Sequence, residues 1–363
     1  MNRFVTRFSL TMLALTLMCG QIRAQFTTTF AKNVNPGQQN GFYYALPETM
    51  LQLDFIIQET EFAKGPLSDY ADRYLEMTDY VEYETTGYKI VDVKMSTKST
   101  PDPNATFFVT FGNVRGSNKI EFDVMPNGII RGVGQGNAMK KVESHEVETY
   151  EQSQCDKEVQ PVTGDRFIGL MSSGKTNAQL AKEVADKIEE IRKAKFNLIS
   201  GYYETAFNPE TFEKMQQQLD EMEKEYLSLF LGKQVEKTIV KTVYVVPNKE
   251  TVTQTIAKFS ETEGLSVGTA GSGSPITVQT LSMNGTEFIN APSQSAIQSM
   301  SYENKVFYRV PEMAQVKVSY MDETLIEDRL SINQLGATLM APIQNTKLVF
   351  DTTTGQIVNL KMQ

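Results

Sequence analysis

The sequence predicts an α+β fold that is mainly β, in which antiparallel β domains flank a two-helix antiparallel hairpin. Three observations lead to this class. Apolar and polar residues alternate over short runs near both ends of the chain, which is typical of strands with one buried face. Two segments in the middle repeat apolar residues in steps of three and four, which is typical of amphipathic helices. An acidic stretch with few apolar residues separates the first strand-rich region from the helices.

These patterns divide the 363 residues into five segments. They are a leader (1–24), a mainly β N-terminal domain (25–140), an acidic linker or long loop (141–165), a helical hairpin (166–234) and a β-rich C-terminal domain (235–363). The length is sufficient for two or three domains with cores of their own.

The first 24 residues have the features of a secretion signal. Arg3 and Arg7 precede the apolar run Phe8–Gly20, which is too short to span a bilayer comfortably. Ala24 then places a small residue at a cleavage position. We therefore expect cleavage after Ala24 and an exported protein, which is periplasmic, associated with the outer membrane or secreted.

The alternative is a lipoprotein signal in which Cys19 is the acylated residue. Such a signal has small residues just before the cysteine, whereas Leu17 and Met18 are bulky. Under either interpretation Cys155 is the only other cysteine of the chain. The sequence therefore predicts an exported protein without an internal disulfide, whose stability comes from packing.

Charge limits the partners that we expect. The leader carries three arginines and no acidic residue, so its removal changes the formal net charge from −9 to −12. This excess of negative charge argues against nucleic acids and anionic membrane surfaces as partners. No segment after the leader has 18 uninterrupted apolar residues, so we do not expect a transmembrane protein.

The N-terminal region contains strand patterns and one short helical segment. The segment Leu67–Met77 follows a Gly-Pro break and has its acidic residues on one side, which favours a helix. The turn sequence Pro126–Gly128 lies between two apolar runs and predicts a β-hairpin. The clearest strand is marked by alternating apolar residues at Leu51, Leu53, Phe55 and Ile57.

The two predicted helices lie between the β regions. The first covers about 177–199, and the second begins at Asn208 and Pro209, a capping residue followed by proline at the first helical position. Gly232 predicts where the second helix ends. Its apolar residues form a seam that needs a partner helix, and the short connection predicts an antiparallel hairpin. The seam consists of Phe212, Met215, Leu219, Met222, Tyr226 and Leu229.

The C-terminal region returns to strand patterns and contains a short internal echo. The pattern Tyr-x-aliphatic-Pro begins at Tyr44, Tyr244 and Tyr308, and two copies continue with Glu48 and Glu312. A random chain of this composition would contain roughly 0.1 such matches. Proline is tolerated at the start of a strand because its missing N–H can face outward. We therefore expect related β modules at these places.

Several longer segments resemble a known family. They are "YALPETMLQLDF", "GPLSDYADRYL", "SSGKTNAQLAKEVADKIEEIRKAKFNLISG", "FYRVPEMAQVKVS" and "LVFDTTTGQIVNL". They resemble an uncharacterised family of exported proteins from Bacteroidetes-type bacteria, described only as a domain of unknown function. The resemblance spans nearly the whole chain after the leader. It implies a signal peptide and an envelope or secreted location, and it carries no catalytic or binding residues.

One stretch matches the phosphate-loop pattern G-x-x-x-x-G-K-[ST], from Gly169 to Thr176. In such a loop Lys175 would contact the outer phosphates and Thr176 would hold Mg²⁺. The pattern normally follows a buried strand, whereas Gly-Asp-Arg interrupts the residues before it, and Asp322 and Asp351 are poor second carboxylates. An exported protein also meets essentially no nucleoside triphosphate. We therefore interpret this stretch as a capped helix start and expect no nucleotide.

Other chemical motifs are incomplete. The glycines in "RGVGQG" match only part of a dinucleotide motif, and we interpret them as a flexible exit from the predicted hairpin. His145 is the only histidine and lies among glutamates, with Cys155 ten residues later. Neither a catalytic triad nor a zinc site is expected from this composition. The sequence therefore predicts no catalytic, cofactor-binding or metal-binding residues and no cofactor.

Two functions of different classes follow. The first is a non-enzymatic envelope or secreted protein that binds an unknown protein or glycan partner, or takes part in an assembly. The alternative is a hydrolase of glycan or peptide that uses two carboxylates. The chain is rich in carboxylates, with 44 Asp and Glu residues, but its sequence does not say which of them face one cleft. We expect the first function, because no complete catalytic motif is visible in the sequence.

Overall fold

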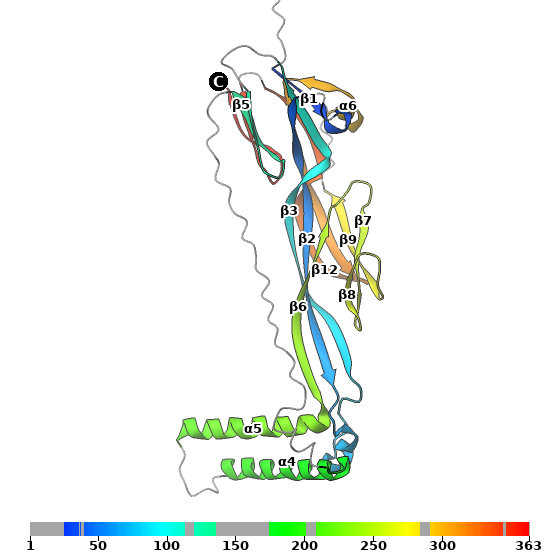
Figure 1. Cartoon of the computed structure of the whole chain (residues 1–363), viewed down its shortest axis with the longest axis vertical. Coiled ribbons are helices and arrows are strands. Elements are labelled where there is room, and N and C mark those ends of the chain that lie inside the picture. Colours follow the sequence, from blue (N-terminus) through cyan, green and yellow to red (C-terminus); the bar gives the residue numbers. More distant parts are fainter. Residues whose placement is uncertain are drawn as a thin grey trace, which may run out of the picture.

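The computed structural model describes residues 25–35, 37, 40–112, 120–135, 174–200, 208–283, 291–343 and 346–362. Over these residues the fold is α+β and mainly β, as the sequence predicts, with three antiparallel sheets and a pair of long helices. Long strands form an elongated body, and the two long helices project from one end across its long axis (Figure 1).

The first sheet has the strand order β10-β1-β3-β2-β6. Its two central strands, β2 and β3, are 23 and 27 residues long and pair along almost their whole length. The residues predicted to alternate in a buried strand lie in the middle of β2, and all four are buried. The strands are β1 (Phe26–Phe30), β2 (Gly41–Ala63), β3 (Thr85–Phe111), β6 (Lys233–Val245) and β10 (Ser301–Glu303).

The second sheet has the order β12-β11-β9-β7-β8. Side chains of this sheet and of the lower half of the first sheet form one large apolar core, which includes Phe55, Val243, Phe259 and Val316. Burial of such a core is the main contribution to the stability of the body. The strands are β7 (Thr253–Ser260), β8 (Gly264–Val267), β9 (Ser274–Ser282), β11 (Lys305–Tyr320) and β12 (Glu323–Pro342).

The third sheet has the order β14-β13-β5-β4 and packs near the other end of the body. The predicted hairpin at Pro126–Gly128 is present, because β4 and β5 pair on either side of it and Gly128 has a φ of +93°. A second core, rich in phenylalanine, joins this sheet to β1, β2, β3 and β11. The strands are β4 (Ile120–Val124), β5 (Ile130–Gln135), β13 (Thr346–Phe350) and β14 (Ile357–Met362).

Two of the three sheets combine strands from both predicted β regions. The first sheet takes β6 and β10 from the C-terminal region, and the third sheet pairs β5 with β13. The N-terminal and C-terminal β segments therefore associate through shared hydrogen bonding as well as through side-chain packing.

The long helices begin and end where the sequence predicts. They are α4 (Asn177–Ile199) and α5 (Pro209–Leu231). The predicted helix at Leu67–Met77 is much shorter, because Glu76 adopts a left-handed conformation with a φ of +55° and ends the helix. The short helical elements are η1 (Ala31–Asn33), η2 (Ser68–Tyr70), α2 (Ala71–Leu75) and α6 (Gln294–Ser299). Within the described part of the chain, no helix combines the length and apolarity needed to span a membrane.

Two copies of the Tyr-x-aliphatic-Pro echo occupy equivalent places. The register of β2 shifts between Ala45 and Pro47, and that of β11 shifts between Val310 and Glu312. Pro47 directly follows such a shift and Pro311 lies within one, and irregular positions of this kind tolerate a residue without an N–H inside a long strand. The copy that begins at Tyr244 differs, because β6 ends at Val245 before its proline. The echo marks two related hairpins, β2–β3 and β11–β12.

Candidate functional site

Two regions of the molecule have features that a functional site requires. The first is the pair α4 and α5, which we call the helical arm. It is attached to the body at one end, where the start of α4 and the end of α5 share a small apolar core with the loop before η2. The core includes Leu180 and Val184 of α4, Leu229 and Phe230 of α5, and Leu67. The arm is therefore fixed at its base and extends away from the body (Figure 1).

The start of α4 contains the end of the phosphate-loop pattern. The Thr176 side chain accepts a hydrogen bond from the Gln179 N–H, and the Gln179 side chain accepts one from the Thr176 N–H, which forms a capping box. The Lys175 ammonium donates to both carboxylate oxygens of Glu183, at 2.5 and 2.7 Å. The sequence predicts a capped helix start with Ser172, Ser173 or Thr176 as the cap, and the structure assigns the cap to Thr176, while residues 169–173 lie outside the described residues.

Ion pairs hold the two helices of the arm together. Arg192 donates to Glu223 at 2.7 Å, and Lys195 lies 2.5 Å from both Asp220 and Glu223. Partial burial by itself would raise the pKa of Glu223, but the hydrogen bonds from Lys195 and Arg192 hold it below its ordinary value. The pairs also show that α4 and α5 are antiparallel, because a later position on α4 pairs with an earlier position on α5.

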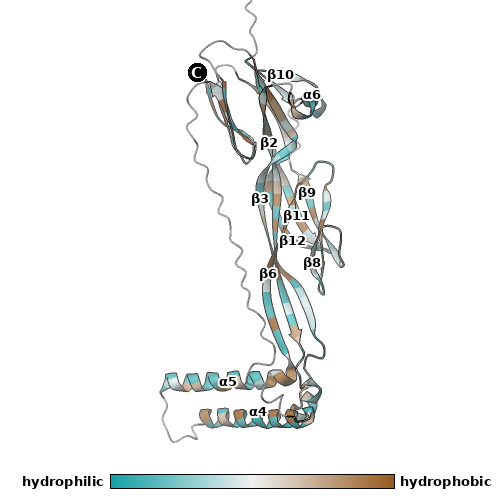
Figure 2. Cartoon of the chain, viewed as in Figure 1, coloured by the Kyte–Doolittle hydropathy of each residue, from teal (hydrophilic) through white to brown (hydrophobic). Residues whose placement is uncertain are grey.

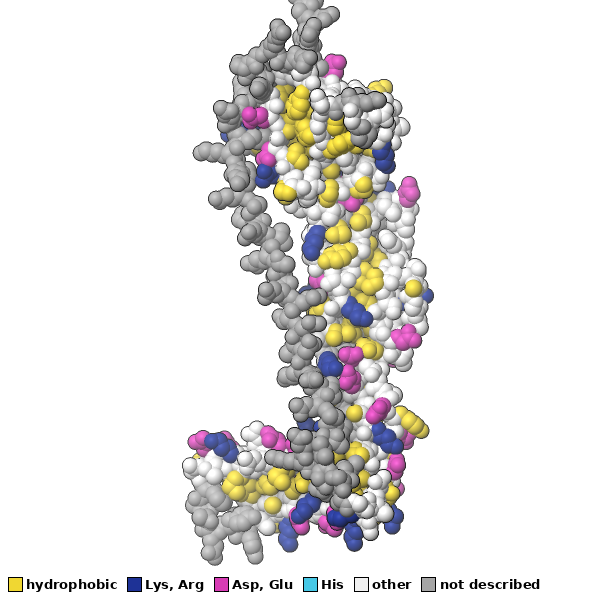
Figure 3. Space-filling view, viewed as in Figure 1, with side chains coloured by type: hydrophobic (Ala, Val, Ile, Leu, Met, Phe, Trp, Pro, Cys, Tyr) yellow, Lys and Arg dark blue, Asp and Glu magenta, His cyan; other side chains and the backbone are white. Residues whose placement is uncertain are grey.

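The arm leaves large apolar side chains in contact with solvent. The buried residues of α5 are Ser228, Leu229 and Phe230, all at its attached end. On the outer half, Phe196 is 71 % exposed and Ile199 is 66 % exposed. Figure 2 shows hydrophobic residues along α4, and Figure 3 shows a band of hydrophobic side chains between the two helices. The predicted seam of α5 is therefore only partly covered by α4.

A shallow hollow lies along one side of α5 and has a volume of about 320 Å³. Its charged residues comprise three acids and one lysine, so the hollow is acidic. The residues that line it are Glu213, Gln216, Gln217, Asp220, Glu221 and Lys224. Asp220 is also the residue that pairs with Lys195, which places the hollow next to the junction of the two helices.

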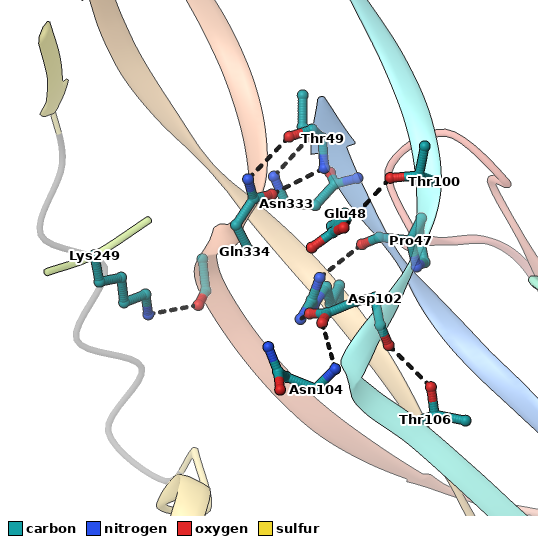
Figure 4. A network of polar contacts seen from close by, with 12 residues as sticks. Pro47, Glu48, Thr49, Thr100, Asp102, Asn104, Thr106, Lys249, Asn333 and Gln334 are labelled. Carbon is teal, nitrogen blue, oxygen red and sulfur yellow. Dashed lines mark hydrogen bonds and ion pairs between the residues drawn. The ribbon is translucent and has the colours of Figure 1, made fainter. Parts of the chain in front are cut away.

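The second region is a buried polar network where the three sheets meet, which we call the polar clasp (Figure 4). At its centre Arg309 of β11 forms an ion pair with Asp102 of β3, and both side chains are buried. Arg309 also donates to the carbonyl of Pro47 at 2.7 Å, and Asp102 accepts from the Asn104 N–H at 2.7 Å. Every charged group at this centre is thus paired, which a buried ion pair requires to be tolerated.

The other half of the polar clasp joins β2 to β12. The Gln334 side chain accepts from the Thr49 N–H and donates to the Thr49 carbonyl, both at 2.9 Å, and it donates to the Pro247 carbonyl at 2.8 Å. The Asn333 side chain donates to Thr353 in the turn between β13 and β14 at 2.6 Å. These bonds link residues from four distant parts of the chain.

Two glutamates near the polar clasp have raised pKa values. Partial burial raises the pKa of Glu48, and the charge of Asp102 adds to this, while Arg309 and a hydrogen bond from Thr100 lower it. Burial also raises the pKa of Glu312, which is 7 % exposed and has a carboxylate oxygen without a partner. A raised pKa is a property of catalytic acids as well as of structural carboxylates.

A small pocket adjoins the polar clasp and has a volume of about 90 Å³. It is lined by hydroxyl groups, one lysine, one asparagine and one leucine. Pockets for small-molecule ligands usually measure about 300–1,000 Å³. This pocket has room for about three water molecules at about 30 Å³ each. The residues that line it are Thr49, Thr97, Lys98, Leu330, Ser331, Asn333, Thr353 and Thr354.

The structure does not bring the other sequence candidates together. Asp322 and Asp351 lie in separate turns that follow β11 and β13. Gly132 is inside β5, instead of in a flexible exit, because it pairs with both β4 and β13. His145 and Cys155 lie outside the described residues. In the described part of the chain, no group of three or more His, Cys, Asp or Glu side chains is arranged to hold a metal ion.

Sequence reasoning did not single out the most informative residues of either region. Asp102 and Arg309 lie 207 positions apart, and no local pattern joins them. Arg309 lies inside the Tyr-x-aliphatic-Pro copy that begins at Tyr308, which is the one signal that pointed to its neighbourhood. Phe196 lies beside the apolar stripe of its helix instead of on it, and this departure from the pattern was the signal for an exposed apolar side chain.

Comparison with known proteins gives one match. The model of a family described as "Domain of unknown function (DUF4831)" matches residues 40–358. No curated protein and no solved structure matches the chain.

Proposed function

Because this chain belongs to the DUF4831 family, whose description assigns no activity, we propose its function from the geometry of the helical arm. The protein is an exported, non-enzymatic binding or assembly protein of the cell envelope or the secreted fraction. The helical arm is the part that contacts the partner, and the long β body is the support that holds it.

The observation that carries this proposal is the exposure of apolar side chains on a well-anchored projection. Phe196 and Ile199 are large and mostly exposed, although they lie on a helix whose other apolar residues are mostly covered. Exposed apolar groups of this kind mark interaction surfaces, since their contact with water costs free energy that a partner recovers. The helical arm offers them at its outer end, away from the described part of the body (Figure 1).

The anchoring of the arm also suits it for binding. A capping box fixes the start of α4, Asn208 caps α5, and the ion pairs of Arg192 and Lys195 hold the helices together. A surface that is already ordered before binding loses less conformational entropy when the partner docks. The arm therefore has the pre-organisation that a binding element needs.

Export rests on the leader. The charged start, the short apolar run and Ala24 predict cleavage and transport across the inner membrane. The resemblance to exported proteins points to the same location. A location outside the cytoplasm also agrees with the acidic net charge, since the expected partner is then a protein or glycan of the envelope instead of a nucleic acid.

The test is site-specific photo-crosslinking in living cells. A photoreactive amino acid replaces Phe196 on the arm or, as the matched control, Val267, which is 61 % exposed on β8 of the body. We expect a discrete crosslinked product from position 196 and none from position 267, and mass spectrometry identifies what is attached. Absence of any product from position 196 would contradict a binding role for the arm.

The alternative function, a carboxylate-based hydrolase of glycan or peptide, has one favourable observation. Glu48 has a raised pKa and lies near Asp102, which is the kind of pair that acid catalysis uses. The adjoining pocket of about 90 Å³ is small for a sugar or peptide residue. Asp102 is also already paired with Arg309, so its carboxylate is not free to act on a substrate. Release of fragments from purified envelope glycan or peptide by the wild-type chain, and its loss in Glu48→Gln, would favour this function over the first.

A further inference from the structure

We propose that the partner of the helical arm is the arm of a second copy of this chain, and that two arms form a four-helix bundle in which α4 of each copy packs against α5 of the other. This inference rests on the binding role proposed above and names the occupant of that surface. It follows from the position of the exposed apolar pair, the acidic hollow and the charges of the two helices.

The apolar pair and the hollow lie on neighbouring sides of the arm. Phe196 and Ile199 follow Arg192 by four and seven residues, so all three lie along one side of α4. Arg192 and Lys195 reach across to α5, where Lys195 meets Asp220 in the hollow. When a second arm packs face to face against the first, the apolar pair of each copy lies over the hollow of the other copy. A two-fold axis requires this reciprocal arrangement.

The ion pairs fix which positions are level with each other. Arg192 pairs with Glu223, and Lys195 pairs with Asp220, so each step forward on α4 corresponds to one step back on α5. On this register Phe196 is level with position 219, at the middle of the hollow, which extends from Glu213 to Lys224. If the two-fold axis runs along the arm, Phe196 of one copy faces the hollow of the other at the same level.

The net charges of the two helices favour packing of α4 against α5 of the second copy over packing of α5 against α5. The helix α4 has five basic and four acidic side chains, a net charge of +1, whereas α5 has two basic and six acidic ones, a net charge of −4. A two-fold axis along the arm places α4 against α5 of the other copy, which is attractive. A two-fold axis across the arm places α5 against α5, which is repulsive.

Individual charges fit the same arrangement. Lys193 is level with position 222, so in the dimer it lies beside Glu221 of the second copy. Glu189 is level with position 226, which is two residues, or about 3 Å along the helix, from Lys224 of the second copy. Within the described residues Lys193, Glu189 and Lys224 have no ion-pair partner in the single chain. The second copy therefore supplies opposite charges where the first leaves them unpaired.

The size of the face is sufficient for a stable dimer. Each helix has 23 residues and is about 34 Å long, and two adjacent helices are about 20 Å wide. The face therefore covers roughly 680 Å² on each copy and roughly 1,400 Å² in total, which is within the range of specific interfaces. The body extends to one side of the arm (Figure 1), and rotation about the arm turns the second body to the opposite side, so the two bodies do not overlap.

The first experiment measures the mass of the purified full chain by light scattering and by sedimentation over a range of concentrations. We expect a dimer that the double variant Phe196→Glu with Ile199→Glu dissociates, with a dissociation constant raised by about 100-fold, since like charges at an interface cost several kcal/mol. Both residues are exposed in the single chain, so an unchanged circular dichroism spectrum is expected to show that the variant is folded.

The matched control lies on the same arm. Met222 stands two residues after Asp220, so it points about 200° around α5 from that residue and away from the hollow. We expect Met222→Glu to remain dimeric. Dissociation of Met222→Glu, with a dimeric Phe196→Glu and Ile199→Glu double variant, would assign the interface to the other face and overturn the proposal.

The charge arrangement has its own test. We expect Lys193→Glu to weaken the dimer by up to about tenfold, as does Glu221→Lys, and the two changes together to restore it, because the pair then has reversed but opposite charges. Failure of the double variant to recover would contradict the placement of Lys193 beside Glu221.

Crosslinking of the tips distinguishes the two axes. In a background with Cys19→Ser and Cys155→Ser, Ser200→Cys places one thiol near the outer end of each arm. With the axis along the arm the two tips lie together, and a short bismaleimide joins two chains. With the axis across the arm the tips are about 34 Å apart and no crosslink forms, which would overturn the proposed arrangement.

Failure of this inference and failure of the proposed function give different results. A chain that is monomeric at all concentrations overturns the homodimer. If position 196 then still crosslinks to a different protein or to a glycan in cells, the binding role of the helical arm stands. If position 196 gives no product in cells either, both proposals fall.

Discussion

The polar clasp and the helical arm use side chains in opposite ways. The polar clasp buries charged and polar groups, among them Asp102 and Arg309, and gives most of them partners within the chain. The helical arm exposes apolar groups, among them Phe196 and Ile199, and gives them no cover within the described residues. Burial of a polar group costs free energy unless its hydrogen bonds are made, and exposure of an apolar group costs free energy unless a partner removes it from water.

This difference separates the two roles of the molecule. Most polar groups of the clasp find their partners within the chain, so its residues hold the three sheets together. The helical arm is packed against the body at its base and leaves apolar side chains exposed at its outer half, where we propose that a second molecule binds. Changes in the polar clasp are therefore expected to lower the free energy of unfolding, whereas changes on the outer arm are expected to alter association.

The largest effect is expected for Arg309→Ala. This change leaves the Asp102 carboxylate buried without its partner, and the loss of one partner of a buried pair costs about 3–5 kcal/mol. Urea denaturation followed by circular dichroism measures the change. The control is Arg131→Ala, which breaks the pair with Asp123, whose side chains are 27 % and 23 % exposed, and is expected to cost less, about 1 kcal/mol. Equal effects of the two changes would contradict the role given to the polar clasp.

A smaller loss is expected for Tyr44→Phe. The Tyr44 hydroxyl is buried and accepts a hydrogen bond from the Phe307 N–H at 3.1 Å, and burial raises the pKa of this phenol. Without the hydroxyl, a buried backbone N–H of β11 has no acceptor, which costs about 1–3 kcal/mol. The same denaturation experiment applies, and Tyr43→Phe, at an exposed tyrosine beside it, is the matched control. An unchanged unfolding midpoint in Tyr44→Phe would argue against this link between β2 and β11.

Thr176→Ala is expected to cost about 1 kcal/mol, because it removes the cap of α4. Since the cap lies at the base of the helical arm, hydrogen exchange is expected to accelerate in the first turns of α4 and to stay unchanged in β2 and β11. Thr176→Ser, which keeps the hydroxyl, is the control and should retain the slow exchange. Faster exchange throughout the body would show that the arm and the body unfold as one unit.

Glu312→Gln is expected to stabilise the protein at neutral pH, by less than about 1 kcal/mol, because it removes a charge from a buried position but leaves a polar group there. Burial raises the pKa of Glu312 in the folded protein above its ordinary value of 4.5. The contribution of Glu312 to the free energy of unfolding of the wild-type chain is therefore most favourable below pH 4.5. It becomes unfavourable as the pH rises through the raised pKa. The gain of the variant should vanish below pH 4.5, and a gain that is independent of pH would refute this account.

The smallest effect on folding is expected for Phe196→Ala. Its side chain is mostly exposed, so the free energy of unfolding of the monomer should change by no more than about 0.5 kcal/mol. The measurement is made at a concentration where the chain is monomeric. A loss as large as that of Tyr44→Phe would show that Phe196 packs within the single chain, and it would remove the contrast between the helical arm and the polar clasp.

Features set by neighbouring residues were predictable from the sequence. The bounds of α4 and α5, the cap at Asn208, the stop at Gly232 and the turn at Gly128 all follow from the preferences of a few adjacent residues, and the structure confirms them. The short helix after Gly65 was predicted too long, because the periodic pattern continues past Glu76 whereas the backbone there turns left-handed.

The arrangement of strands was not predictable in the same way. Alternation in β2 indicates that one face is buried, but it does not say that β3 lies on one edge and β6 on the other. The sequential order of β regions predicted two separate modules, whereas β6 and β13 join strands from the opposite end of the chain. Such pairings depend on contacts between residues that are distant in sequence, which no local preference encodes.

By itself the sequence determined the elements of this protein: which segments are strands, where the two long helices begin and end, and that the chain is acidic and carries a leader-like start. The tertiary structure decided which elements meet. It brought Asp102 to Arg309 across 207 positions, and it left Phe196 and Ile199 uncovered at the outer end of the arm. The physical reason is that backbone preferences and periodicity act over a few residues, whereas burial of a charge or exposure of an apolar side chain depends on the whole folded chain.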